Sequence, residues 1–181
     1  MKKNECHKGT YVLTLDLGHK IKLFRYLGLK TPSATDQIYK DFQKELAKKI
    51  TDSMPECNVR MIEMRDLAEK ILTRAYKKVG GLRNAVVISS CNEIANLGRG
   101  YTLEINRIVN NEGEIKGIGP RPGYPSMRDQ FNSIAAVVSG RPVVLVEDGS
   151  FTGNTMKYVV RKLRDRNIAV ACIVLGFAFN D

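Results

Sequence analysis

The sequence has no tryptophan and only two histidines, His7 and His19, among its 181 residues. Its four cysteines, at positions 6, 57, 91 and 172, form no Cys-x-x-Cys pair, so the spacing typical of a zinc site is missing. No apolar run approaches the ~20 residues that cross a bilayer, and no apolar stretch of signal-peptide type follows the first lysines. These absences argue against a zinc protein and against a membrane protein, and they predict a cytoplasmic protein.

Positive charge, in contrast, is in excess. Lysine and arginine number 29 against 19 aspartates and glutamates, which gives a formal net charge of +10. Such an excess indicates an anionic partner, either a phosphorylated metabolite or nucleic acid, although a lysine-rich surface that serves solubility is the alternative. The basic residues are spread along the chain without a block of five or more, which weighs against a nucleic-acid-binding tail. Nucleic acid is therefore a partner that the sequence allows but does not favour.

The N-terminal third predicts a small α+β subdomain. Residues 10–17 alternate apolar and polar side chains as a half-buried strand does, and residues 21–24 suit the returning strand of a hairpin. Apolar residues at steps of four then predict a helix that begins at Thr35 or Asp36 and ends near residue 50. We therefore expect a hairpin-plus-helix subdomain at residues 1–60 and a larger core at residues 61–181.

The core alternates predicted helices and strands, which is typical of a parallel sheet with helices on its faces. The predicted elements are a helix at 65–79, a strand at 85–88, a loop or irregular hairpin at 110–130, a helix through 131–138, a strand at 143–146, a helix at 156–166 and a strand at 168–177. Residues 94–109 suit either a helix weakened by Gly98 and Gly100 or a loop that leads into a strand at 101–109, and the second is favoured. The strand at 143–146 is expected to be central, between the other two.

One short stretch, VVLVEDGSFTGNT at residues 143–155, has the pattern of a ligand site. In open parallel sheets, ligands bind beyond the carboxyl ends of the strands, where Glu147 and Asp148 are expected. Paired carboxylates suit two neighbouring ribose hydroxyls or a magnesium ion. The turn that follows leads into a helix, whose first backbone N–H groups attract an anion such as phosphate. The alternative is a plain strand–turn–helix in which the polar residues only cap the helix.

This stretch resembles the phosphoribosyl pyrophosphate motif of type I phosphoribosyltransferases, in which four apolar residues and two acids precede three variable residues and Thr-Gly-x-Thr. The four valine and leucine residues at 143–146, Glu147, Asp148, Thr152, Gly153 and Thr155 match that pattern, whereas Gly149, Ser150 and Phe151 differ from its usual residues. The wider order is also similar to the family's, with a helix at 65–79, a strand at 85–88, a pyrophosphate loop at 89–93 and a long loop at 110–130.

The resemblance implies a doubly wound parallel sheet of phosphoribosyltransferase type, with the N-terminal subdomain as a hood that recognises the base. It implies a fifth core strand as well, for which residues 178–181 offer no candidate, so either the fold is shortened or the chain is a fragment. The activity that it implies is transfer of phosphoribose from phosphoribosyl pyrophosphate to a purine or pyrimidine base, with release of pyrophosphate. A homodimer is the expected assembly.

The resemblance also implies roles for single residues. Glu147 and Asp148 would hold the ribose hydroxyls and, through the ligand, magnesium. The residues expected to bind the phosphates are Gly149, Ser150, Thr152, Gly153, Asn154, Thr155, Ser89, Ser90, Arg99 and Arg121. Arg99 belongs to a Gly-Arg-Gly sequence after the pyrophosphate loop, and Arg121 belongs to the long loop, which would close over the leaving group. The alternative is a regulatory or nucleotide-binding protein of this type that does not catalyse a reaction.

Overall fold

The computed structural model describes residues 10–15, 28, 37–55, 58–81, 84–112, 114–150 and 153–178. The chain forms two compact units, Met1–Asp66 and Leu67–Asp181. None of the helices in the described segments is long and apolar enough to span a membrane.

The first unit contains a parallel pair of strands and a helix. Its elements are β1 (Thr10–Leu15), α2 (Gln37–Ser53) and β2 (Asn58–Glu63). The predicted strand and helix are both present, within a few residues of their expected bounds. The partner of β1 among the described residues is β2, which the sequence did not lead us to expect, and the two strands run parallel with Thr10 opposite Asn58. The second strand of the predicted hairpin, at 21–24, lies outside the described residues.

The second unit is an α/β unit that begins within helix α3. Counting this helix, it has ten elements. They are α3 (Met64–Val79), β3 (Val86–Ser89), α4 (Asn92–Leu97), β4 (Tyr101–Thr102), β5 (Ile105–Val109), β6 (Ile115–Pro120), α5 (Met127–Val138), β7 (Val143–Ser150), α6 (Asn154–Arg164) and β8 (Val170–Ala178).

Four of the strands form one parallel sheet in the order β4-β3-β7-β8. Val86 lies opposite Val143, and Val146 lies opposite Val174, so β7 runs between β3 and β8. The prediction that the strand at 143–146 is central between the other two is confirmed. Its apolar residues are all buried, which explains why the run has no polar alternation.

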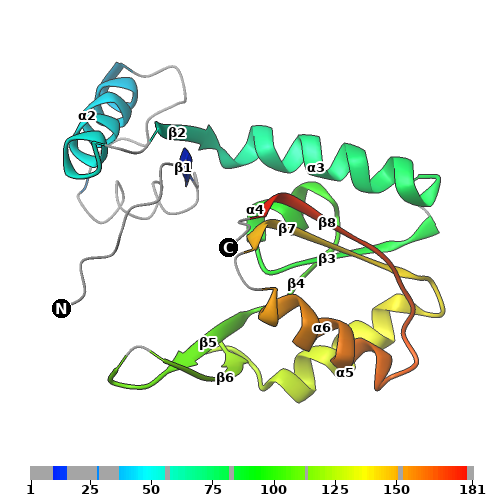
Figure 1. Ribbon diagram of the computed structural model, residues 1–181. Coiled ribbons are helices and arrows are strands. Elements are labelled where there is room, and N and C mark those ends of the chain that lie inside the picture. The colour runs from blue at the N-terminus through cyan, green and yellow to red at the C-terminus, as the bar shows by residue number, and fades with distance from the viewer. Residues whose placement is uncertain are drawn as a thin grey trace. The chain divides into compact units, whose positions relative to one another are not determined.

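Helices lie on both faces of this sheet (Figure 1). On one face, Ile88 and Leu145 pack in a cluster with Phe131 of α5 and with Val159 and Leu163 of α6. The other face is covered by α3 and α4. There the chain comes so close that a Cβ at Gly98, directly after α4, would lie 3.0 Å from a Leu72 methyl carbon and 3.1 Å from one of Val87.

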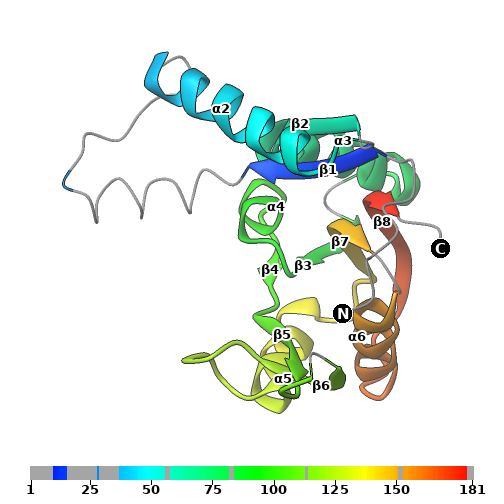
Figure 2. The ribbon, with the colours of Figure 1, turned by 60° about the vertical axis from the view of Figure 1, so that its left-hand side comes forward.

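The middle of the chain corrects one prediction and decides between the two alternatives of another. The loop expected before the strand at 101–109 contains the short helix α4, and that strand is divided into β4 and β5 by Leu103 and Glu104. The segment at 110–130, for which a loop or an irregular hairpin was predicted, contains β6, which pairs antiparallel with β5 in a hairpin that is irregular at Ile108 and Val109, so the hairpin alternative is the correct one. The hairpin extends from the sheet on the side of α5 and α6 (Figure 2).

Helix α5 begins at Met127, four residues before the expected start at 131, because Ser126 caps it. The Ser126 hydroxyl oxygen accepts a hydrogen bond of 3.2 Å from the backbone N–H of Asp129. The first turn of α5 therefore occupies the end of the segment that the sequence assigned to the long loop.

Candidate functional site

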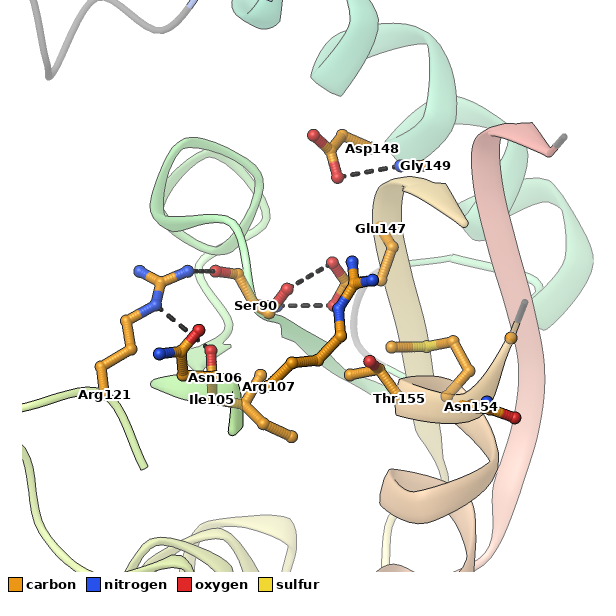
Figure 3. Close-up of a pocket in the computed structure, with 12 residues that line it drawn as sticks. Ser90, Ile105, Asn106, Arg107, Arg121, Glu147, Asp148, Gly149, Asn154 and Thr155 are labelled. Atoms are coloured by element: carbon orange, nitrogen blue, oxygen red, sulfur yellow. Dashed lines mark hydrogen bonds between the residues drawn. The ribbon is translucent and has the colours of Figure 1, made fainter. Parts of the chain in front are cut away.

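The site lies where the chain changes direction across the sheet. From β3 the chain passes through α4 to β4 on one side, and β7 lies on the other side of β3. Such a switch point opens a crevice at the carboxyl ends of the two strands. A cavity of about 230 Å³ occurs there (Figure 3), lined by Ser90, Ile105, Asn106, Arg107, Arg121, Glu147, Asp148, Gly149, Gly153, Asn154, Thr155 and Met156.

Glu147 is anchored at the floor of this cavity by Ser90. The backbone N–H of Ser90 donates to one carboxylate oxygen of Glu147 and the Ser90 hydroxyl donates to the other, each over 2.6 Å. Only 5% of Glu147 is exposed, so these two donors replace water around a carboxylate that would otherwise be costly to bury. The carboxyl ends of β3 and β7 are thereby joined by side-chain bonds as well as by the sheet.

Burial raises the pKa of Glu147 from 4.5 to about 7. The two hydrogen bonds from Ser90 oppose this rise because they stabilise the charged form, and the Arg121 guanidinium opposes it as well. The neighbouring carboxylate of Asp148 adds to the rise. A carboxyl group whose pKa lies near neutrality can exchange a proton at physiological pH, which is common at functional sites.

Asp148 follows on the same strand and is half-buried. One of its carboxylate oxygens accepts a hydrogen bond of 2.8 Å from the backbone N–H of Gly149. Gly149 and Ser150 were expected in the phosphate-binding turn, but they continue β7, where Gly149 lies opposite Phe177 and Ser150 opposite Ala178. A Cβ at Gly149 would overlap the Phe177 ring, which explains a glycine where the resembling motif has an aliphatic residue.

The N-terminus of α6 forms another wall of the cavity. Gly153 caps this helix with a left-handed backbone (φ 70°), a conformation that favours glycine, and no described side chain caps it. The first backbone N–H groups of a helix have no intrahelical acceptors, and the first two residues of α6, Asn154 and Thr155, line the cavity. The expected ligand residues Gly153, Asn154 and Thr155 therefore do come together with Glu147 and Asp148. Thr152 and Phe151 lie outside the described residues.

Arg121 lies on the opposite side of the cavity and holds three backbone segments together. Its guanidinium donates to the carbonyl oxygens of Ser90 over 3.0 Å and of Ile105 over 3.3 Å, and to a carboxylate oxygen of Glu104 over 3.0 Å. Figure 3 shows Ser90 between Arg121 and Glu147. Arg121 was expected in a long loop that closes over the leaving group, whereas it directly follows β6 and is hydrogen-bonded to Ser90 at the floor of the site.

Two further lining residues, Asn106 and Arg107 of β5, were not foreseen from the sequence. Both are exposed, and the Arg107 side chain extends from β5 in the direction of Glu147 (Figure 3). Their only signal in the sequence is that two polar residues interrupt the apolar residues of a predicted strand. Arg107 adds positive charge to a cavity that also carries two carboxylates, so both a phosphate and a hydroxyl-bearing sugar find complementary groups there.

Two expected site residues lie elsewhere. Ser89 is fully buried at the end of β3, where its hydroxyl oxygen accepts a hydrogen bond of 3.1 Å from the backbone N–H of Cys91. Arg99 follows α4 with a left-handed backbone (φ 47°) and lines a separate cavity beside Tyr101 and Arg141. The described lining of the Glu147 cavity therefore includes Ser90 but neither Ser89 nor Arg99.

The side chains of the cavity suit a cation only if the bound ligand supplies most of the oxygen atoms that coordinate it. Among the described residues, no group of three or more His, Cys, Asp or Glu side chains could hold a metal ion. Both carboxylate oxygens of Glu147 already accept hydrogen bonds from Ser90. Magnesium keeps several waters and binds through one or two carboxylates plus substrate phosphates, so this donor set suits only a metal that arrives with a polyphosphate and takes most of its ligands from it.

The arrangement combines two carboxylates, a helix N-terminus and two arginines around one polar cavity. Carboxylates accept from hydroxyl groups, and the helix N-terminus and the guanidinium groups bind anionic oxygens. The site is thus suited to a phosphorylated sugar rather than to an apolar ligand. No family profile and no curated protein sequence matches this chain, so these contacts are the evidence for what the site binds.

Proposed function

We propose that this chain has the doubly wound fold of type I phosphoribosyltransferases and transfers phosphoribose from phosphoribosyl pyrophosphate to a nitrogenous base. The observation that carries the proposal is the position of Glu147 and Asp148. They lie at the carboxyl end of a central parallel strand, in one cavity with the N-terminus of the next helix. A motif that only capped a helix would not require a buried carboxylate held by the end of the neighbouring strand.

The proposed roles follow from the chemistry of each group. The carboxylate of Asp148 accepts hydrogen bonds from the ribose hydroxyls, and Glu147 supports the same sugar from the floor of the cavity. The first backbone N–H groups of α6 and the Thr155 hydroxyl bind the 5-phosphate. The Ser90 segment and the positive charge of Arg107 and Arg121 receive the pyrophosphate.

The proposed reaction exchanges one bond at the anomeric carbon of ribose. The bond from this carbon to the pyrophosphate oxygen breaks, and pyrophosphate leaves with the electron pair. A nitrogen of the base supplies the pair for the new carbon–nitrogen bond and then loses its proton. No side chain of the chain attacks the sugar, so these residues act by positioning and by stabilising charge. Magnesium, when bound with the ligand, would neutralise charge on the departing pyrophosphate.

Binding without catalysis is the second candidate, and one observation favours it. Three donors of the Arg121 guanidinium bond to Ser90, Glu104 and Ile105, so this arginine is engaged within the protein rather than directed only at a leaving group. A protein that senses phosphoribosyl pyrophosphate, or another nucleotide, needs the same sugar and phosphate contacts but no base acceptor.

Calorimetric titration with phosphoribosyl pyrophosphate and magnesium tests the proposed site, and a screen of purine and pyrimidine bases for pyrophosphate release tests the transfer. The proposal predicts saturable binding that Asp148→Asn weakens and that Asp165→Asn, at the far end of α6, leaves unchanged. Binding without pyrophosphate release from any base would favour the second candidate. If the ligand does not bind at all, both candidates for this ligand are wrong.

A further inference from the structure

A buried polar side chain, Gln130 of α5, connects to the site from outside its cavity. Only 3% of Gln130 is exposed, and it is followed on α5 by Phe131, which is also buried. Burying an amide is costly unless its donors and acceptor are all bonded. The partners of Gln130 therefore indicate what the side chain is for.

Gln130 holds both polar groups of one backbone residue. Its amide oxygen accepts from the backbone N–H of Glu104 over 2.8 Å, and its amide nitrogen donates to the Glu104 carbonyl over 3.1 Å and to that of Pro125 over 2.9 Å. The reverse orientation of the amide would set its nitrogen against an N–H and its oxygen against two carbonyls, so only one orientation fits. Gln130 thus fixes the segment between β4 and β5 against the start of α5.

Glu104 passes this constraint to Arg121. Its carboxylate accepts from the Arg121 guanidinium over 3.0 Å, and its carbonyl oxygen accepts from the backbone N–H of Arg121 over 3.0 Å. Glu104 is 8% exposed, whereas 40% of the Arg121 side chain is exposed, so loss of Arg121 would leave the Glu104 carboxylate buried without its cation. The orientation of the guanidinium is therefore set by Glu104.

Arg121 in turn fixes Ser90. The guanidinium donates to the Ser90 carbonyl oxygen over 3.0 Å, while the N–H and the hydroxyl of the same residue donate to Glu147. Ser90 is thus held on both sides, by Arg121 through its carbonyl and by Glu147 through its donors. A continuous series of hydrogen bonds runs from α5 to the carboxyl end of β7.

We propose that Gln130 and Glu104 are positioning residues of the site, which act on the ligand through Arg121 and Ser90 without lining the cavity themselves. The proposal that the ligand is phosphoribosyl pyrophosphate is needed only for the choice of the probe. The inference about Ser90 rests on the hydrogen bonds alone. The alternative is that Gln130 and Glu104 only stabilise the fold. A matched control variant distinguishes this alternative from a positioning role.

The test compares Gln130→Met with Ile134→Ala. The methionine side chain would keep the length of the glutamine but provide neither the donor nor the acceptor of an amide. Ile134 is fully buried one turn further along α5, and its aliphatic side chain forms no hydrogen bond, so its truncation lowers stability through a cavity and leaves the bonded series intact. The first readout is the NMR chemical shift of the Ser90 amide proton and its protection from hydrogen exchange, both in ligand-free protein. The Ser90 resonance is identified by its change in the Glu147→Gln variant.

Gln130→Met is expected to shift the Ser90 amide resonance toward its position in Glu147→Gln and to reduce its protection. It should also raise the dissociation constant for phosphoribosyl pyrophosphate with magnesium by about two- to thirtyfold, the range for residues that act through a network. Ile134→Ala should leave both quantities near their wild-type values. If Gln130→Met does not fold, Glu104→Gln replaces it, since this variant keeps an acceptor for Arg121 but removes the charge, and a smaller change in the same direction is expected.

The inference is overturned if Gln130→Met or its replacement leaves the Ser90 amide resonance unchanged, or if that resonance moves and the affinity does not. A wild-type protein that fails to bind phosphoribosyl pyrophosphate would contradict the proposed function only. In that case the Ser90 amide alone decides whether Gln130 positions the floor of the cavity, because this readout needs no ligand.

Discussion

The Glu147 carboxylate accepts two hydrogen bonds of 2.6 Å from Ser90, a residue that lies 57 positions earlier in the sequence. The parallel register explains the meeting, because Ile88 lies opposite Leu145 and Ser90, directly after β3, is therefore level with Glu147 of β7. A charged group enclosed in this way is rigid, since any movement of Ser90 would leave it without donors. The two residues form a fixed floor for the cavity, which holds the ends of β3 and β7 in place.

Replacing Ser90 with alanine should destabilise the protein and perturb Glu147. The variant removes the hydroxyl donor and leaves only the backbone N–H for a buried carboxylate. We expect the free energy of unfolding at pH 8 to fall by roughly 1.5–3 kcal/mol, the range for hydrogen bonds to charged groups. Urea denaturation measures it. Ser90→Thr keeps the hydroxyl and should retain most of the stability; equal losses in the two variants would show that the hydroxyl is not the cause.

The stability of the protein should decrease as pH rises through neutrality. Because the pKa of Glu147 is raised from 4.5 to about 7 in the folded state, the folded protein holds this proton more tightly than the unfolded chain does. The resulting stabilisation is complete below about pH 4.5 and is lost as pH approaches and passes 7. At 1.36 kcal/mol per pH unit, the loss between pH 5 and pH 8 is roughly 2–3 kcal/mol.

Glu147→Gln provides the comparison for this pH dependence. The amide does not titrate, its oxygen can accept from the Ser90 N–H, and the Ser90 hydroxyl can turn to accept from its nitrogen. The difference in unfolding free energy between wild type and variant should therefore shift in favour of the variant from pH 5 to pH 8. A difference that stays constant over this range would mean that Glu147 titrates at its ordinary value.

The strands and the position of the motif could be predicted because their signals are local. The continuous apolar run at 143–146 marks a strand that is covered on both faces, the apolar run at 168–177 marks a further strand, and alternation with helices marks a parallel sheet. Adjacent acids at the end of such a run predict a site at the carboxyl edge of the sheet, and Glu147 and Asp148 do line a cavity there. The residues that define the site most directly are therefore those next to a strong strand pattern.

The remaining contacts could not be predicted because they join distant segments. Nothing near Gln130 in the sequence indicates that it bonds to Glu104, 26 positions away, or that Arg121 bonds to Ser90, 31 positions away. The extension of β7 to Ser150 depends on pairing with β8, and the close approach of Phe177 explains Gly149. Such features follow from packing between elements, which a local pattern does not contain.

Gly149→Ala should destabilise the protein because the new methyl group would overlap the Phe177 ring. Overpacking of this kind costs about 1–3 kcal/mol, and urea denaturation should show a loss of that size. Adding Phe177→Ala should make the double variant more stable than the sum of the single effects predicts. Gly117→Ala is the control, since a Cβ at Gly117 meets no atom within 4 Å, and its effect should stay within about 0.5 kcal/mol.

Thr155→Val should weaken phosphate binding without changing the fold. The substitution keeps the shape of the side chain and removes a hydroxyl that lines the cavity in the first turn of α6. If this hydroxyl binds the 5-phosphate, affinity for phosphoribosyl pyrophosphate should fall by roughly 1.5–3 kcal/mol, measured by calorimetry. Thr73→Val on the exposed side of α3 is the matched control, and equal affinities for all three proteins would argue against a phosphate at this helix.

Asp148→Asn should separate recognition of the sugar from recognition of the phosphate. An asparagine oxygen can still accept the hydrogen bond that Gly149 donates to Asp148, so the strand end should keep its structure. The variant loses the charge that makes a carboxylate a strong acceptor for ribose hydroxyls, and affinity for phosphoribosyl pyrophosphate should fall by roughly 1.5–3 kcal/mol.

Inorganic phosphate makes no such contact, and the loss of a nearby negative charge should leave its binding unchanged or slightly stronger. Calorimetry with both ligands measures the two effects in one protein. If the variant weakens the binding of phosphate and of phosphoribosyl pyrophosphate equally, Asp148 affects recognition of the phosphate group rather than of the ribose hydroxyls. This result would contradict its proposed role.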